Sequence, residues 1–215
     1  LRGPRLISVN SEPNQTAWRT FMAAKARGEK SVKVSIAVGQ DPLIWTISGS
    51  RIVNRQSKKK VDELAIAGGM QGMPVKVVRS ETNDYLIPAH AEMIIEGVVP
   101  LDETLPEGPF GEMYQYLGSV REENFFMNVT AVTHRRDPWI LNQFTGATRG
   151  YVTGPTAVLY NQGLKRLVPN LIELHSPVDA TGLTYVRIKK EKPGDGLEAG
   201  KKLAQIIPIF KVIVV

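Results

Sequence analysis

The sequence has no cysteine among its 215 residues, which excludes disulfide bonds and cysteine-ligated metal sites. It has no apolar run long enough to span a bilayer, and its first residues do not resemble a secretory signal. The three histidines, His90, His134 and His175, are too far apart for zinc-ligand or catalytic-triad spacing, and no serine stands in a nucleophile elbow. These absences argue against a membrane protein, a disulfide scaffold and a serine hydrolase. The cytoplasm is the expected compartment.

The sequence has fewer acidic than basic residues. It contains 21 aspartates and glutamates and 27 lysines and arginines, which gives a formal net charge of +6. A basic balance can serve nucleic acids, anionic membranes or anionic ligands. The basic residues are scattered, however, and no aromatic residues are interleaved with them for base stacking. We therefore expect solvated basic residues, with at most a modest attraction for an anionic substrate or a cofactor phosphate, and no nucleic-acid partner.

The length suits one large domain or two small ones, and hydrophobic residues make up an ordinary 42% of the chain. Apolar spacing and capping residues predict helices at 13–27, 42–47, 61–69, 155–167 and 195–205. Alternation and apolar β-branched runs predict strands at 5–9, 32–38, 75–80, 89–99, 125–135, 139–144, 171–175, 183–188 and 210–215, the last of them buried. This order predicts an α+β fold with a twisted antiparallel sheet.

The stretch from Pro106 to Glu112 (PEGPFGE) carries two carboxylates five residues apart. Its prolines and glycines exclude a helix and disfavour a strand, so we expect a shaped loop. Such a loop can turn Glu107 and Glu112 into one pocket, where two partly desolvated carboxyl groups cannot both ionise easily. One of them could then deliver a proton near neutral pH. In an arbitrary sequence the same heptapeptide is more often a surface turn with two solvated glutamates.

The residues on both sides of this loop resemble the UbiD-type decarboxylases. The segment from Ala91 to Gly97 (AEMIIEG), then PEGPFGE and Met113, is similar to the signature of that family, and the similarity is strongest between Lys33 and Arg135. Enzymes of this family use prenylated FMN to remove, or reversibly add, a carboxyl group on aromatic or α,β-unsaturated acids.

The resemblance implies a split β-barrel related to flavin reductases, with flanking helices. Residues 1–215 would be the central catalytic domain of a longer chain, with an N-terminal α/β segment and a C-terminal domain largely absent, and the full-length protein would form a homo-oligomer. The start at Leu1 and the end inside an apolar run favour the same interpretation.

The resemblance also implies roles for individual residues. Glu107 and Glu112 correspond to the catalytic pair in proton transfer, which works with an arginine that would lie upstream of Leu1. Glu63 corresponds to a ligand of Mn²⁺ or Mg²⁺ near the flavin phosphate, and K⁺ is a further implied ion. An exposed glutamate in the first turn of a helix is the plainer explanation of Glu63. Of two other metal ligands, an asparagine would lie upstream and a histidine falls near Thr16, which departs from the family pattern.

Three further positions correspond to cofactor or substrate contacts. Gln15 and Ser48 fall where the family contacts cofactor or phosphate, Ser48 in an expected polar turn at 48–50. Met113 would line the substrate side. A helix-start glutamine, a turn serine and a core methionine explain the same residues without any ligand.

Three functions remain open from the sequence. The first is a prenylated-FMN-dependent (de)carboxylase, which the presence of both Glu107 and Glu112 favours. The second is a flavin-binding split-barrel module without decarboxylase activity, and the third is a non-catalytic subunit of a carboxylase complex. Thr16 and the missing flanking segments favour the second and third.

The scattered charge gives a first testable prediction. We expect the protein to bind single-stranded DNA no more tightly than nonspecific contact, with a Kd of roughly 10⁻⁴–10⁻⁶ M at physiological salt. Fluorescence anisotropy with a labelled oligonucleotide measures this constant. A submicromolar Kd would contradict the prediction.

Overall fold

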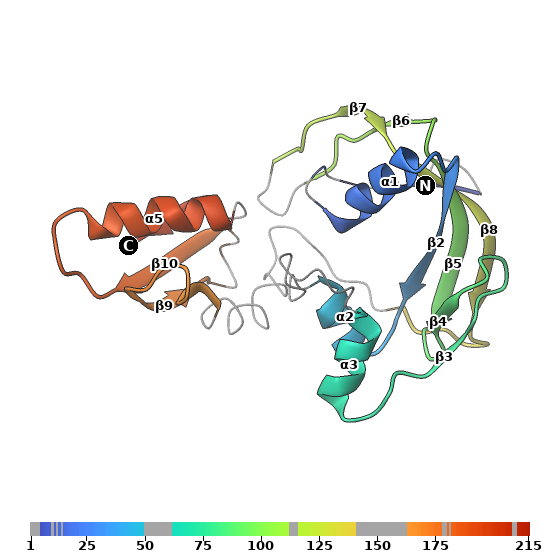
Figure 1. Ribbon diagram of the computed structural model, residues 1–215, viewed down its shortest axis with the longest axis horizontal. Coiled ribbons are helices and arrows are strands. Elements are labelled where there is room, and N and C mark those ends of the chain that lie inside the picture. Colours follow the sequence, from blue (N-terminus) through green and yellow to red (C-terminus); the bar gives the residue numbers. More distant parts are fainter. Residues whose placement is uncertain are drawn as a thin grey trace. The chain divides into compact units, whose positions relative to one another are not determined.

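The computed structural model describes residues 5–9, 11, 13, 15–49, 62–111, 116–140, 163–177, 180, 182–207 and 210–215. The chain divides into two compact units (Figure 1). Unit 1 comprises Leu1–Pro109 and Ser119–Asn142, and unit 2 comprises Phe110–Gly118 and Gln143–Val215. Each unit has its own hydrophobic core.

Unit 1 is built on a four-stranded sheet with the order β1-β8-β5-β2. Its strands are β1 (Leu6–Ser8), β2 (Ser31–Val38), β5 (Met93–Pro100) and β8 (Phe126–His134), and every neighbouring pair is antiparallel. Alternating β-branched residues suit these long strands. The β5–β8 register shifts at Gly97, where an added Cβ would lie 2.4 Å from the Asn128 carbonyl oxygen. Glycine is therefore required at the point where β8 approaches β5 most closely.

Helix α1 (Thr16–Ala26) packs against this sheet (Figure 1). Its buried residues are Phe21 and Ala24, and the Phe21 ring meets the Phe125 ring edge to face at a centroid distance of 5.1 Å. The neighbouring Met22 is exposed. The buried core around the two rings consists of Phe21, Ala24, Val99, Leu101, Phe125 and Met127.

Helices α2 (Pro42–Gly49) and α3 (Glu63–Gln71) pack together through Ile44, Ile47 and Ala67. Their starts follow the sequence signals, because the Asp41 carboxylate accepts from the Leu43 N–H (2.8 Å) and the Asp62 carboxylate accepts from the Leu64 N–H (2.9 Å). The prediction of a turn from residue 48 is wrong, since Ser48 and Gly49 continue α2.

Two small antiparallel ribbons complete unit 1. One joins β3 (Val77–Arg79) to β4 (Leu86–Pro88), and the other joins β6 (Leu105–Glu107) to β7 (Arg121–Asn124). The prediction of a loop from Pro106 onward is wrong for Pro106 and Glu107, which lie in β6. The register is irregular between Leu105 and Glu107, and β6 has a single strand partner, so a proline that lacks an N–H is tolerated there.

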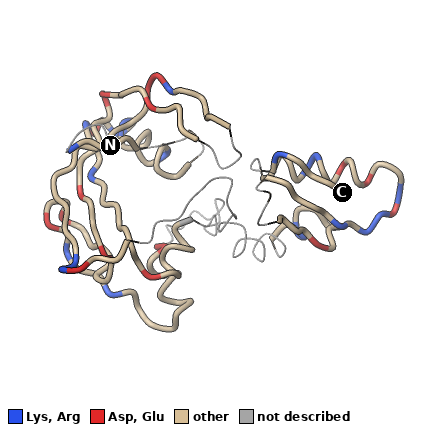
Figure 2. The backbone as a smooth tube through the Cα atoms, turned by 180° about the vertical axis from the view of Figure 1, so that it is seen from behind, with Lys and Arg blue, Asp and Glu red and all other residues tan. Residues whose placement is uncertain are grey.

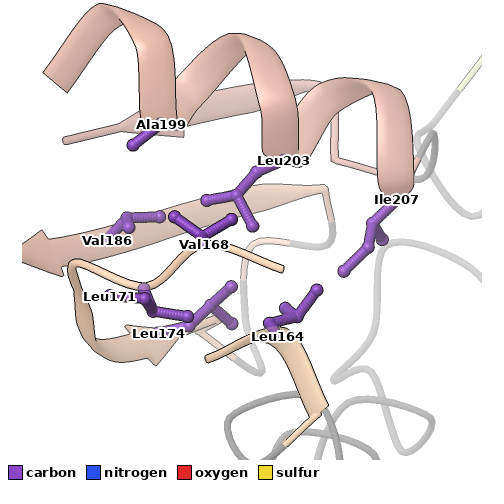
Figure 3. Close-up of a cluster of buried hydrophobic side chains, with 8 residues drawn as sticks. All are labelled: Leu164, Val168, Leu171, Leu174, Val186, Ala199, Leu203 and Ile207. Carbon is purple, nitrogen blue, oxygen red and sulfur yellow. The ribbon is translucent and has the colours of Figure 1, made fainter. Parts of the chain in front are cut away.

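Unit 2 contains a three-stranded sheet with the order β11-β10-β9. Its strands are β9 (Leu171–His175), β10 (Leu183–Ile188) and β11 (Val212–Val214), and β11 runs parallel to β10. Helix α5 (Asp195–Ile206) covers one face through a buried apolar cluster (Figure 3). The cluster consists of Leu164, Val168, Leu171, Leu174, Val186, Ala199, Leu203 and Ile207.

The terminal strand differs from the prediction in its burial. Residues 212–214 form a strand as expected, but Val212 and Val214 are exposed. Of this strand, only Ile213 packs against the α5 cluster, because β11 is an edge strand and its alternate side chains turn to the face that lacks α5.

The α+β class is confirmed, with mostly antiparallel sheets. None of the sheets in the described residues closes into a barrel, so the split barrel stays a prediction. Trp139 and Ile140 are not in a strand, and the rest of the expected 139–144 strand lies outside the described residues. The same holds for the expected 155–167 helix before residue 163. Across the described ranges, no helix is long and apolar enough to cross a membrane.

Glu96, on β5, is fully buried at 0% exposure. Its carboxylate accepts hydrogen bonds from the backbone N–H groups of residues 81, 82 and 83 at 2.8, 2.7 and 3.1 Å, and from the Thr82 hydroxyl at 2.7 Å. Burial raises the pKa of Glu96, but these hydrogen bonds outweigh burial and leave the pKa below its usual value of 4.5. Glu96 therefore holds the turn between β3 and β4 onto the central sheet.

We predict that Glu96→Gln destabilises unit 1 by about 3 kcal/mol, because an amide leaves buried N–H donors without an acceptor. Amide hydrogen exchange at residues 81–83 should lose protection, and the melting temperature should fall. Because the folded pKa is lowered, the contribution of Glu96 is fully present above pH 4.5 and is lost as the pH falls through the folded pKa. The exposed Glu123→Gln on β7 is the matched control, and equal protection in both variants would contradict the assignment.

Candidate active site

Glu107 is a buried carboxylate at the end of β6, with 5% of its surface exposed. Its Oε2 accepts a hydrogen bond from the side-chain amide of Asn124, which ends β7. No hydrogen bond to Oε1 is found among the described residues. The β6–β7 register pairs Glu107 with Arg121 across the ribbon. One half of the predicted catalytic pair is therefore desolvated and oriented by a neighbouring strand.

Asn124 is itself buried and fixed by three partners. Its Oδ1 accepts from the Ser11 hydroxyl at 3.0 Å and from the Phe125 N–H at 2.9 Å. Ser11 is also buried, and its carbonyl accepts from the Arg121 guanidinium at 3.4 Å. Sequence reasoning missed Ser11 and Asn124. The only local signal is a polar residue placed directly before the apolar run that begins at Phe125.

Glu112 and Met113 lie outside the described residues, so their meeting with Glu107 in one pocket stays a prediction. On either side of them the loop folds back on itself. Gly111 forms an isolated antiparallel bridge with Leu117, and the Gly118 N–H donates to the Phe110 carbonyl at 2.8 Å. The described residues that precede Glu112 and follow Met113 are therefore paired with each other.

Glu63 lies exposed in the first turn of α3, where Asp62 caps the helix. No group of three or more acidic or histidine side chains within the described residues could hold a metal ion. Thr16, at the position of the missing histidine, begins α1 directly after Gln15, the N-cap residue, whose side chain makes no capping hydrogen bond. A metal bound by Glu63 would need its other ligands from elsewhere in the protein.

Ser48 fits a phosphate ligand poorly as it stands in the structure. It is exposed on α2, and its hydroxyl donates to the Trp45 carbonyl at 2.8 Å. A serine hydroxyl has one hydrogen, so it cannot donate to a phosphate while it keeps this bond. Phosphate binding by Ser48 requires its hydroxyl to turn away from the Trp45 carbonyl.

The AEMIIEG segment of the signature has a structural role. The carboxylate of Glu92 pairs with the Arg135 guanidinium at 3.3 Å and accepts from the Trp139 N–H at 3.0 Å. Glu96 holds the β3–β4 turn, and Gly97 permits the close approach of β8. In this part of the signature the glutamates bind backbone donors and an arginine of their own unit.

A cavity of about 240 Å³ lies in unit 1, and its lining includes neither Glu107 nor any other described site residue. It is lined by Gln40, Asp41, Ile44, Gln71, Met73, Pro74, Val75, Lys76, Pro88, His90 and Ala91. This cavity gives no support to the predicted site.

Charge in the described residues is mixed along both units (Figure 2). Basic side chains form exposed pairs with acidic ones, for example Lys30 with Asp102 at 3.3 Å and Arg187 with Glu173 at 3.0 Å. Exposed pairs of this kind contribute little to stability, about 0–1 kcal/mol each. They are consistent with the expected solvated basic residues, and the weak nucleic-acid binding stays a prediction.

Relatives of the chain include two proteins named only as uncharacterized. One, from Archaeoglobus fulgidus, is 28% identical over 179 residues, which cover 81% of this chain and 36% of the relative. The other, from Aquifex aeolicus, is 29% identical over 201 residues, which cover 91% of this chain and 39% of the relative. The chain thus spans less than two fifths of the length of these curated relatives.

Among solved structures, the chain resembles an evolved dimeric form of the UbiD-class enzyme HmfF from Pelotomaculum thermopropionicum in complex with prenylated FMN. The TM-score is 0.75 at 26% identity, over 99% of this chain and 49% of that one. Apo 3,4-dihydroxybenzoic acid decarboxylase from Klebsiella pneumoniae gives a TM-score of 0.70 at 20% identity, over 99% of this chain and 46% of that one, and shares the fold.

The family model for UbiD, described as the 3-octaprenyl-4-hydroxybenzoate carboxy-lyase Rift-related domain, matches residues 1–148. The match contains Glu92, Glu96 and the whole PEGPFGE segment. With more than half of its length matched, this chain belongs to the UbiD family.

Proposed function

We propose that the full-length protein is a reversible, non-oxidative decarboxylase of aromatic or α,β-unsaturated carboxylic acids that uses prenylated FMN. Residues 1–215 form its central catalytic domain, a split β-barrel with flanking helices. The likeness to HmfF in complex with prenylated FMN supports the cofactor, and family membership supports the reaction class. The chain spans about half of HmfF, so the activity belongs to the longer protein.

One observation carries the proposal. Glu107, a residue of the PEGPFGE segment, is a buried carboxylate that accepts a hydrogen bond from Asn124. Buried carboxylates in enzymes are suited to proton transfer because their environment can be tuned. Among the described residues Oε2 has a fixed partner and Oε1 has none, so Oε1 is the oxygen that can face a substrate or a second carboxyl group.

Prenylated FMN, when bound, supplies the electron sink for cleavage of the bond to the carboxyl group. The protein supplies the proton. When CO₂ leaves, the electron pair that remains on the substrate carbon takes a proton from Glu112. Glu107 pairs with Glu112 and orients it for this transfer. Met113 lines the substrate side of the loop.

Cofactor binding falls to other residues. Gln15 contacts the flavin at the start of α1, and Ser48 contacts its phosphate once its hydroxyl turns away from the Trp45 carbonyl. Glu63 binds Mn²⁺ or Mg²⁺ near that phosphate, since hard cations prefer oxygen ligands, and K⁺ is a further ion of the site. The remaining metal ligands come from outside the described residues.

The partners are a small aromatic or unsaturated acid and further copies of the same chain, and the compartment is the cytoplasm. The dimeric form of HmfF supports oligomerisation. A second candidate function is a flavin-binding module or a non-catalytic subunit of a carboxylase complex. The engaged hydroxyl of Ser48 favours it, as does the absence of a metal-ligand group in the described part of the chain. Release of CO₂ by the full-length protein with prenylated FMN separates the two.

We predict that Glu112→Gln in the full-length protein retains flavin but loses decarboxylation by about 10²–10⁴-fold, because an amide cannot deliver the proton. The variant should also fail to exchange solvent deuterium into the product carbon, which mass spectrometry measures. The exposed Glu103→Gln, just before β6, is the matched control and should keep wild-type turnover. Near-normal turnover of Glu112→Gln would move the proton donor to Glu107 or outside this chain.

We predict that Glu63→Gln in the full-length protein lowers its flavin content, because an amide is a weaker ligand for a hard cation than a carboxylate. Flavin absorbance per protein after gel filtration measures this, with the exposed Glu123→Gln as control. Unchanged flavin content would leave Glu63 as a helix-terminus residue with no role in cofactor binding.

A further inference from the structure

We propose that Asn124 is a positioning residue for the Glu107 carboxylate. The inference rests on the proposed function for its catalytic consequence, but its structural basis stands on the described residues alone. Asn124 lies 17 residues beyond Glu107, on the partner strand of the β6–β7 ribbon. It is outside both AEMIIEG and PEGPFGE.

The orientation of the Asn124 amide is determined by its donors. The Phe125 N–H can only donate, and it faces Oδ1 at 2.9 Å together with the Ser11 hydroxyl at 3.0 Å. If the amide were rotated by half a turn, its NH₂ group would face the Phe125 N–H, donor against donor. The NH₂ group therefore points to Glu107, and it can only donate to Oε2.

The backbone around Asn124 is equally fixed. Phe125 is buried in the core of unit 1, where its ring meets Phe21, and its carbonyl accepts from the Val9 N–H at 3.0 Å. Strand β7 ends at Asn124 and β8 begins at Phe126. Any shift of the Asn124 side chain would disturb a packed aromatic pair or leave buried polar groups unpaired, and both are costly.

Because Asn124 is fixed by the core, its hydrogen bond also fixes the position of the Glu107 carboxylate. The N–H donated to Oε2 selects one rotamer of Glu107 and directs Oε1 away from Asn124. The charged group opposite Glu107 in the ribbon is Arg121, whose guanidinium also donates to the Ser11 carbonyl. Misplacement of a reacting group by about 1 Å can cost roughly 10²-fold in rate, so a fixed carboxylate has kinetic value.

Asn124→Asp is the sharpest test, because aspartate keeps the shape and still accepts from Ser11 and Phe125. Its second oxygen would face Glu107 Oε2, and two carboxylates in contact cannot both ionise. In the full-length protein with prenylated FMN, we expect kcat at pH 8 to fall about 10–100-fold, with a smaller change in KM. Towards pH 5 the ratio of variant to wild-type kcat should recover, because one shared proton restores the hydrogen bond.

Two further variants separate positioning from folding. Asn128→Asp, the same change at an exposed site on β8, should keep turnover within twofold of wild type from pH 5 to 8. Asn124→Asp combined with Glu107→Gln exchanges donor and acceptor across the contact. This double variant should recover the melting temperature lost by Asn124→Asp at pH 8, yet stay inactive because the carboxylate of Glu107 is gone.

Each outcome decides the proposal. Asn124→Asp turnover within twofold of wild type at pH 8, or an equal loss at every pH, would overturn it. If the wild-type protein shows no turnover, the proposed function fails, and the melting temperatures still decide the contact. The deficit of Asn124→Asp relative to wild type must then widen as pH rises from 5 to 8 and disappear in the double variant. A pH-independent deficit would leave Asn124 without a link to Glu107.

Discussion

A carboxylate removed from water must find hydrogen-bond donors, and this constraint organises unit 1. Glu96 binds three backbone N–H groups and a hydroxyl, and so fixes the turn between β3 and β4 to the central sheet. Glu92 binds Arg135 and the backbone of Trp139. Glu107 binds Asn124, and through it Ser11. Each buried or half-buried acid ties together segments that are distant in sequence, so the sheet, the ribbons and the N-terminal segment depend on one another.

The family signature therefore combines two different requirements. In AEMIIEG the two glutamates and the glycine maintain the architecture of β5 and its neighbours. In PEGPFGE the strand β6 delivers Glu107 to a buried position, and Gly108 directly beyond it adopts a positive φ of 88° that favours glycine. The residues between AEMIIEG and PEGPFGE connect β5 of the central sheet to β6. A sequence that kept one half and lost the other would keep either the scaffold or the acids, and not both.

Local signals in the sequence predicted the elements whose causes are local. Asp41 caps α2 as its place before Pro42 predicts, and the alternation over 125–135 gives β8 at Phe126–His134. The errors arise where a distant segment decides. Pro106 enters a strand because β7 supplies the partner, and β11 is exposed because α5 covers only the opposite face of its sheet. Asn124 escaped notice because Ser11, one of its partners, lies 113 residues away.

The number and kind of donors also distinguish Glu96 from Glu107. Glu96 accepts from three backbone N–H groups and a hydroxyl, and these hydrogen bonds lower its pKa, so it is a poor proton donor. All four donors belong to the turn between β3 and β4. Glu107 receives one neutral amide on one oxygen. A carboxylate held at one oxygen has a fixed direction and still has an oxygen for another partner. A sequence pattern locates both glutamates equally well, whereas only the surrounding donors distinguish an acid that builds the fold from one that can take part in a reaction.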